Sequence, residues 1–189
     1  MTTQPDRLPP LPEADWTPEQ HRAARPIIEG PRGALISPFV PLLRSPELMD
    51  HVQRLGEYLR YRNALGVRLS ELAILVVARH ASQAVEWAIH VPIALREGVA
   101  DGTVEAIARD QRPPQMPPDE ALVHDFSRQL LHKQLVDDAT WQAAVAAFGE
   151  KGVMDLVGVI GYYALLAMVM NVAQTSVPPG PELPALDRQ

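Results

Sequence analysis

Hydrophobic residues recur every three or four positions over most of this chain, which is the spacing expected of amphipathic helices. The pattern begins clearly between Pro46 and about Leu65, where several apolar residues fall on one helical face: Leu48, Val52, Leu55 and Leu59. No stretch of useful length alternates apolar and polar residues as a half-buried strand does. The chain is therefore predicted to be all-α.

Prolines divide this helical pattern into regions. All but one of the 19 prolines fall into three clusters, at 5–46, 113–118 and 178–184. Because proline lacks the N–H that a helix interior needs, these clusters predict an arm, a linker and a tail. We expect an extended N-terminal arm at 1–46 that is partly packed on the body, a helical domain at 47–175 and a proline-rich tail at 176–189. Within the arm, Thr17 is predicted to cap a short helix.

Two blocks of helices are expected inside the domain, at 47–110 and 119–175. Helix starts and stops in the sequence predict segments at about 46–65, 70–80, 82–98 and 101–109, and then at about 119–134, 138–148 and 152–173. Ser82 is expected to cap the helix that follows the break near 80–82. The similar order of helices predicts two related helical halves.

One predicted helical segment, 156–170, carries no charge. It is shorter than the roughly 20 residues that span a bilayer, and Gly158 and Gly161 interrupt it. A helix that is apolar on all sides is otherwise buried in a core or in an oligomer interface. We expect burial rather than a membrane span.

Composition and charge narrow the classes of function. Hydrophobic residues make up 47% and charged residues 21% of the 189 residues, as in an ordinary globular domain. The net charge of −6 and the lack of a Lys/Arg run argue against nucleic acid or an anionic membrane as the main partner. The absence of cysteine excludes disulfides, thiolate zinc sites and a catalytic thiol. The polar N-terminus has no apolar signal-peptide core, so a cytoplasmic protein is expected.

The strongest candidate site consists of Glu71, Gln83, Glu86 and His90, separated by 12, 3 and 4 residues. The last three can share one helical face, and Glu71 would reach them from the preceding helix. Two carboxylates and an imidazole in an apolar interior could move protons, with Glu86 orienting one nitrogen of His90. The alternatives are an exposed Glu86–His90 ion pair, and ordinary first-turn positions for Glu71 and Gln83.

Other residues could complete a pocket or could have purely structural positions. Arg79 and His80 flank the break between two helices, where they could line a pocket mouth or lie in a solvated turn. Tyr162 could place its hydroxyl in the pocket or pack in the core. No third ligand accompanies Glu86 and His90, so neither a metal nor another cofactor is expected.

Four segments around these residues resemble the carboxymuconolactone decarboxylase family, which includes the alkylhydroperoxidase D-like (AhpD-like) proteins. They are SELAILVVAR at 70–79, EWAIH at 86–90, REGVA at 96–100 and VEAI at 104–107. The similarity extends over roughly residues 30–175. The resemblance implies an all-α bundle that assembles as a homo-oligomer, as a dimer, trimer or hexamer.

The resemblance also assigns positions in the site. The hydroperoxidases of the family place a Glu, a Cys-x-x-Cys pair and a His at this spacing, which correspond here to Glu71, to Gln83 and Glu86, and to His90. Neither residue at the cysteine positions can form a sulfenate or a disulfide, so thiol peroxidase chemistry is excluded. The decarboxylases keep a Glu four residues before the His, as Glu86 and His90 do, but generally lack the acid at Glu71.

These observations predict a cofactor-free acid–base enzyme, a lyase or isomerase of a small carboxylated lactone or carbonyl compound, of the kind found in aromatic catabolism. His90, paired with Glu86, would transfer a proton at carbon, with Glu71 as the partner acid. Five residues are expected to bind the substrate, with the first holding its carboxylate: Arg79, His80, Gln83, Trp87 and Tyr162. The competing hypothesis is a non-catalytic helical oligomer that binds a ligand or partner, and an AhpD-like antioxidant hydroperoxidase is least favoured because cysteine is absent.

Overall fold

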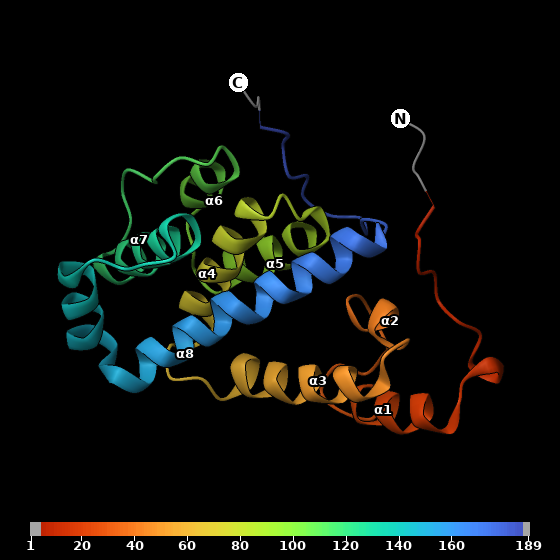
Figure 1. The fold of residues 1–189 in the computed structure, drawn as a ribbon. Helices are drawn as coiled ribbons and strands as arrows, with labels where there is room; N and C mark the ends of the chain where they lie inside the picture. The colour runs from red at the N-terminus through yellow and green to blue at the C-terminus, as the bar shows by residue number, and fades with distance from the viewer. Residues whose placement is uncertain (1–4, 187–189) are drawn as a thin grey trace.

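The computed structural model describes residues 5–186, so 1–4 of the arm and 187–189 of the tail lie outside it. Within this range the chain forms helices and no strand, which confirms the all-α prediction (Figure 1). The elements are η1 (Glu13–Asp15), α1 (Pro18–Ile28), α2 (Phe39–Leu42), α3 (Pro46–Tyr61), α4 (Val67–His80), α5 (Ala84–Arg96), α6 (Asp101–Ala108), α7 (Pro118–Lys133) and α8 (Asp138–Ala173).

Helix α4 forms the centre of the molecule. It packs against α5, α7 and α8, and every residue from Leu69 to Arg79 is buried. A helix that is apolar on nearly all sides is stable only where other helices surround it. Figure 1 shows α8 running across the molecule with α4 and α5 behind it. The two helices that carry the candidate site therefore lie at the core.

Helix α8 is bent at Gly149, whose φ of 68° and ψ of 167° are not helical. The predicted break between two helices is therefore present at this position. By length and composition α8 could cross a membrane, but 56% of its most apolar window is buried in the structure, as in the core helix of a soluble protein. Within the uncharged segment, Leu156, Ile160 and Met170 are buried, whereas Met168 is exposed.

The N-terminal arm folds onto the body. Helix α1 begins at the predicted cap, where Thr17 and Gln20 form a reciprocal capping box. Helix α1 packs on α3, and α2 packs on α3 and α8. Ile27 and Phe39 are buried in the same core as the body helices. The arm is thus anchored by hydrophobic burial, and its segment between α1 and α2 lies next to α3 and α8.

Within the described residues, the start of the arm and the start of the tail meet near the C-terminus of α8. The backbone N–H of Arg7 donates to the carbonyl oxygen of Ala173 at 2.8 Å, and the backbone N–H of Ser176 donates to Asp6 at 2.8 Å. Farther along the tail, Arg79 donates to the carbonyl oxygen of Pro184 at 2.6 Å. The tail is therefore tied to α4.

A buried carboxylate joins α3, the α3–α4 loop and α8. Asp155 accepts hydrogen bonds from the Tyr58 hydroxyl, the Ala64 backbone N–H and the Lys151 ammonium, each at 2.8 Å. Burial raises the pKa of Asp155, but hydrogen bonds from Lys151, Ala64 and Tyr58 outweigh it, so the pKa is lowered. This network fixes the orientation of α3 relative to α8.

Some helix ends differ from those predicted. Helix α3 ends at Tyr61 rather than near Leu65. The side chain of Asn63 accepts hydrogen bonds from the backbone N–H groups of Leu65 and Gly66, and this forms a turn in place of the helix. The prediction that Ser82 caps α5 is wrong. Ser82 has a left-handed φ of 50°, and the cap of α5 is Gln83, whose side chain accepts from two backbone N–H groups of the first turn.

Candidate functional site

The candidate residues come from two helices that pack against each other. Glu71 lies in the second turn of α4, and Glu86 and His90 lie one turn apart on α5. All three are buried, with exposed fractions of 3%, 3% and 5%. Ionisable side chains are rarely buried this completely unless they are paired or have a function. The exposed surface ion pair, which was the alternative for Glu86 and His90, is therefore excluded.

His90 is paired with Glu71 and not with Glu86. The distance from His90 Nδ1 to Glu71 Oε2 is 2.6 Å, and the His90 side chain has no other hydrogen bond within residues 5–186. The expected Glu86–His90 pair is wrong because α4 packs directly on α5 and brings Glu71 to the imidazole from the facing helix. With Nδ1 engaged, Nε2 is the nitrogen that can act on a ligand.

Glu86 has an unusual environment. Its Oε2 atom is buried and has no hydrogen-bond partner within residues 5–186. Burial, together with the negative charge of nearby Glu71, raises the pKa of Glu86 well above its ordinary value. The N–H groups of Val85 and Glu86, which could have stabilised a carboxylate, are capped by the side chain of Gln83. This environment favours the neutral form of the Glu86 carboxyl.

A cavity of about 50 Å³ lies beside these groups. Its lining combines apolar side chains with Glu86, His90 and two tyrosines of α8, Tyr162 and Tyr163. The rings of His90 and Tyr163 meet edge to face, with centroids 5.1 Å apart. Burial raises the pKa of Tyr162 to about 12, so this hydroxyl is a hydrogen-bond donor at neutral pH. The expectation that Tyr162 reaches the pocket agrees with this lining.

The other four expected substrate-binding residues do not line this cavity, and two of them, Arg79 and His80, lie at the far end of α4. Arg79 follows Glu71 by eight residues on α4, or about 12 Å of helix. It donates to the carbonyl oxygens of Ala108 and Pro184, so it cannot anchor a substrate carboxylate in this cavity. His80 packs edge to face on His132, with ring centroids 4.7 Å apart.

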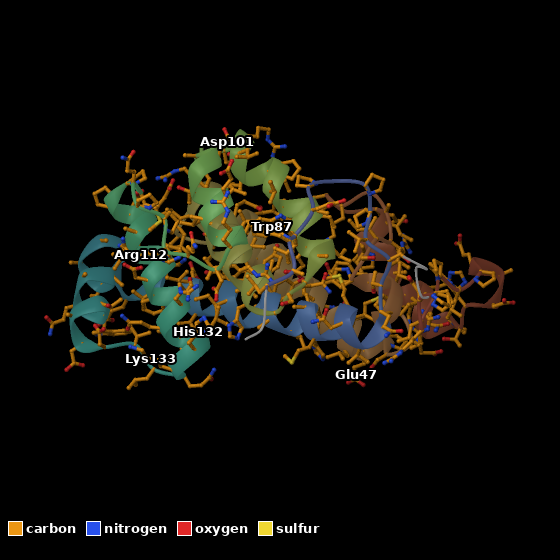
Figure 2. The ribbon with its side chains drawn as sticks, turned by 90° about the horizontal axis from the view of Figure 1, so that it is seen from above. Glu47, Trp87, Asp101, Arg112, His132 and Lys133 are labelled. Atoms are coloured by element: carbon orange, nitrogen blue, oxygen red, sulfur yellow. The ribbon has the colours of Figure 1, made fainter. Side chains whose placement is uncertain are left out.

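Trp87 and Gln83 have structural positions. Trp87 is only 2% exposed and belongs to the hydrophobic core. Figure 2 shows Trp87 near the middle of the molecule, and it shows His132, the partner of His80, toward the end of α7. The amide of Gln83 caps α5 and donates to Asn171 Oδ1 at 2.8 Å. Neither residue lines the cavity.

The cavity also contains residues that sequence reasoning missed. Arg32, from the arm between α1 and α2, and Arg60, from the last turn of α3, both line it. Their contribution depends on how the arm and α3 pack against α8, which no local pattern reveals. One usable signal was Gly56, a glycine inside a helix four residues before Arg60, because such a glycine often marks a close contact.

No group of three or more His, Asp or Glu side chains in residues 5–186 is arranged to hold a metal ion. The chemistry that the described site can perform with its own residues is proton transfer, from a neutral carboxyl and an oriented imidazole on one small apolar cavity.

Comparison with solved structures identifies proteins of similar fold. The chain is similar to a peroxidase-related protein from Silicibacter sp. TM1040, with a TM-score of 0.72, 13% identity and coverage of 92% of this chain and 93% of that chain. An alkylhydroperoxidase AhpD core protein from Ralstonia eutropha JMP134 gives a TM-score of 0.70 at 17% identity, covering 93% and 94%. A protein of unknown function from Agrobacterium tumefaciens, named as a putative antioxidant defence protein AhpD, gives a TM-score of 0.65 at 16% identity, covering 73% of this chain and 95% of that chain.

Identities this low establish a shared fold, which is the AhpD-like helical fold. Residues 46–118, which include Glu71, Glu86 and His90, match the model of the carboxymuconolactone decarboxylase family. The resemblance to this family seen in the sequence is therefore confirmed over this segment, and the fold is AhpD-like. A search of curated protein sequences gave no match.

Proposed function

We propose that this protein is a cofactor-free acid–base enzyme, a lyase or isomerase of a small carboxylated lactone or carbonyl compound. The observation that carries the proposal is the buried carboxyl of Glu86, which has one oxygen without a partner and lines the same cavity as His90. A buried carboxylate without a partner is costly, so the neutral form is favoured. The neutral form is also the one that a general acid needs at pH 7.

The two α5 residues would have complementary roles. In the tautomer whose Nδ1–H donates to Glu71, Nε2 of His90 carries the lone pair and is the base. Glu71 is then a positioning residue rather than the partner acid that the sequence suggested. Glu86 is the acid, and its position beside an apolar cavity favours proton delivery to carbon.

Either reaction balances with these groups and water. In an isomerisation, His90 removes a proton from the carbon beside a carbonyl, the C–H electron pair moves into the carbonyl, and Glu86 returns a proton at another carbon. In a decarboxylation, the bond to the departing CO₂ breaks, its electron pair forms an enolate, and Glu86 protonates the carbon. After a decarboxylation water restores the proton of Glu86, whereas after an isomerisation the proton that His90 removed passes through water to Glu86. A positioned acid or base typically contributes about 10²–10⁴-fold to the rate.

The names of the similar structures refer to peroxidase and antioxidant proteins. Peroxide reduction by a thiol needs a cysteine thiolate, and this sequence has no cysteine. We therefore do not propose thiol peroxidase activity for this chain.

The test is a set of small carboxylated lactones and 2-oxo acids incubated with the protein in D₂O and followed by proton NMR. The expected result is CO₂ loss or deuterium incorporation at carbon for at least one compound, reduced by about 10²-fold or more in His90→Ala and Glu86→Gln. Glu182→Gln, which changes an exposed residue of the tail, is the matched control. Turnover that is unchanged in both site variants would contradict the proposal.

A further inference from the structure

Two positive charges line the cavity from segments that are distant in sequence. Arg32 lies between α1 and α2, and Arg60 lies in the last turn of α3. Neither guanidinium forms an ion pair with a carboxylate of residues 5–186. Four arginines nearby in the sequence do form such pairs: Arg22 with Glu19, Arg25 with Glu29, Arg54 with Asp50 and Arg62 with Glu57. Acidic residues outnumber basic residues in this chain, which has a net charge of −6. Two arginines that line one cavity without an acidic partner are therefore a distinctive feature of this cavity.

The packing around Arg32 holds its guanidinium at the cavity. The guanidinium carbon lies 4.9 Å from the centroid of the Phe39 ring. Gly56 provides the space. A Cβ atom at this position would lie 2.0 Å from the Tyr162 hydroxyl oxygen and 3.0 Å from Arg32 Nη2. The absence of a side chain on α3 therefore allows the arm arginine and the Tyr162 hydroxyl to meet beside the cavity.

The acids of the site do not neutralise these two charges. Glu71 is engaged with His90 at 2.6 Å, and Glu86 is suited to remain neutral. The cavity of about 50 Å³ is large enough for about three to four water molecules. A small organic anion of about four non-hydrogen atoms is of comparable size. Guanidinium groups bind carboxylates through paired, charge-assisted hydrogen bonds.

We propose that Arg32 and Arg60 bind the carboxylate of a small organic acid in this cavity, and that the arm thereby determines which substrates are accepted. The proposal rests on the proposed acid–base function and names its substrate class, an organic anion. Arg60 lies within the family segment 46–118, whereas Arg32 lies outside it. The arm residue would thus be a specificity determinant that lies outside the segment matched by the family model. Substrates larger than the cavity would require the segment 32–38 to move outward.

The test uses acetate and its neutral analogue acetamide as probes. Protein labelled with ¹⁵N-histidine is titrated with each probe, and the ring signals of His90 are followed after assignment by comparison with His90→Ala. Wild-type protein is expected to show saturable acetate binding, with acetamide binding at least about tenfold more weakly. Arg32→Gln and Arg60→Gln should each weaken acetate binding about tenfold or more, since each removes charge-assisted hydrogen bonds. Arg54→Gln, whose arginine pairs with Asp50 on the surface of α3, should change it less than about twofold.

Three results would overturn the proposal: no saturable acetate binding, equal binding of acetamide, or unchanged binding in both arginine variants. Circular dichroism of each variant checks that the helices are intact. The isotope-exchange experiment on Glu86 and His90 does not use these variants. Failure of the anion site would therefore be distinguishable from failure of the acid–base function.

Discussion

Nδ1 of His90 lies 2.6 Å from Oε2 of Glu71, and this contact joins the two central helices α4 and α5 inside the core. It orients the imidazole by a hydrogen bond from a facing helix rather than from the same helix. The contact separates the roles of the two carboxyls: Glu71 holds His90, and Glu86 is left without a partner on Oε2. This division of roles underlies the predictions below.

Glu71→Gln is predicted to lower turnover by about 10²-fold while leaving the helices intact, because the amide can no longer fix the His90 tautomer with a negative charge. The ¹⁵N shifts of the His90 ring should move toward a mixture of tautomers. Glu105→Gln, which changes one member of an exposed ion pair on α6, is the control. Unchanged His90 shifts in Glu71→Gln would show that Glu71 does not position the ring.

Glu86→Gln is predicted to remove a pH dependence of stability. Because the pKa of Glu86 is raised in the folded state, the unfolded chain loses this proton first as pH rises above about 4.5. The free energy of unfolding of the wild type should therefore fall with pH above that value, by at most about 1.4 kcal/mol per pH unit from this group, until the folded-state pKa is passed.

Urea unfolding of the wild type and the Glu86→Gln variant between pH 5 and 8 tests this sign. The variant should gain stability relative to the wild type as pH rises, and Glu182→Gln in the exposed tail should run parallel to the wild type. A constant difference between wild type and Glu86→Gln over this range would be inconsistent with a raised pKa.

Gly56→Ala is predicted to disturb the cavity. The added methyl group would lie 2.0 Å from the Tyr162 oxygen, and this tyrosine is buried, so the ring cannot move without displacing its neighbours. The expected loss is about 1–3 kcal/mol in the free energy of unfolding, with weaker acetate binding.

Gly161→Ala on α8 is the matched control, because a Cβ there meets nothing within 4 Å. It should be neutral or stabilising by up to about 1 kcal/mol, since alanine is the better helix former. Equal stability and equal acetate binding of the two alanine variants would show that Gly56 makes no space for the site.

Asp155→Ala is predicted to lower the free energy of unfolding by about 1–3 kcal/mol, because the variant leaves the partners of a buried carboxylate unsatisfied. The carboxylate accepts from Tyr58, Ala64 and Lys151 and holds α3 against α8. Thermal or urea unfolding measures the effect. Asp50→Ala removes an exposed ion pair on α3 and should cost less than about 1 kcal/mol. Similar losses of unfolding free energy in the two variants would contradict the role of Asp155 in holding α3 against α8.

The sequence predicted the helices better than their contacts. Apolar periodicity located α3, α4 and α5, because each helix must bury one face or more. It misplaced the end of α3, where the side chain of Asn63 forms a turn that competes with the helix. The spacing of Glu71, Glu86 and His90 correctly predicted that these residues lie on two helices that pack against each other.

The pairing within the site was not predictable from spacing. Whether His90 bonds to Glu86 or Glu71 depends on how α4 rests on α5, which is a tertiary relationship. Arg79 looked like an anchor because it is close to the site in sequence, yet it lies at the opposite end of α4. Arg32 was missed for the converse reason: it is 39 residues before Glu71 in the chain and reaches the cavity only because the arm packs on the body.

The central claim is that Glu86 is a neutral acid in a cavity lined also by His90. The most direct measurement is ¹³C NMR of protein labelled at the glutamate carboxyl carbons, comparing wild type with Glu86→Gln at pH 7. We predict one signal at the shift of a protonated carboxyl in the wild type that is absent from the variant. A wild-type spectrum in which every glutamate carboxyl has the shift of an ionised carboxylate at pH 7 would contradict the claim.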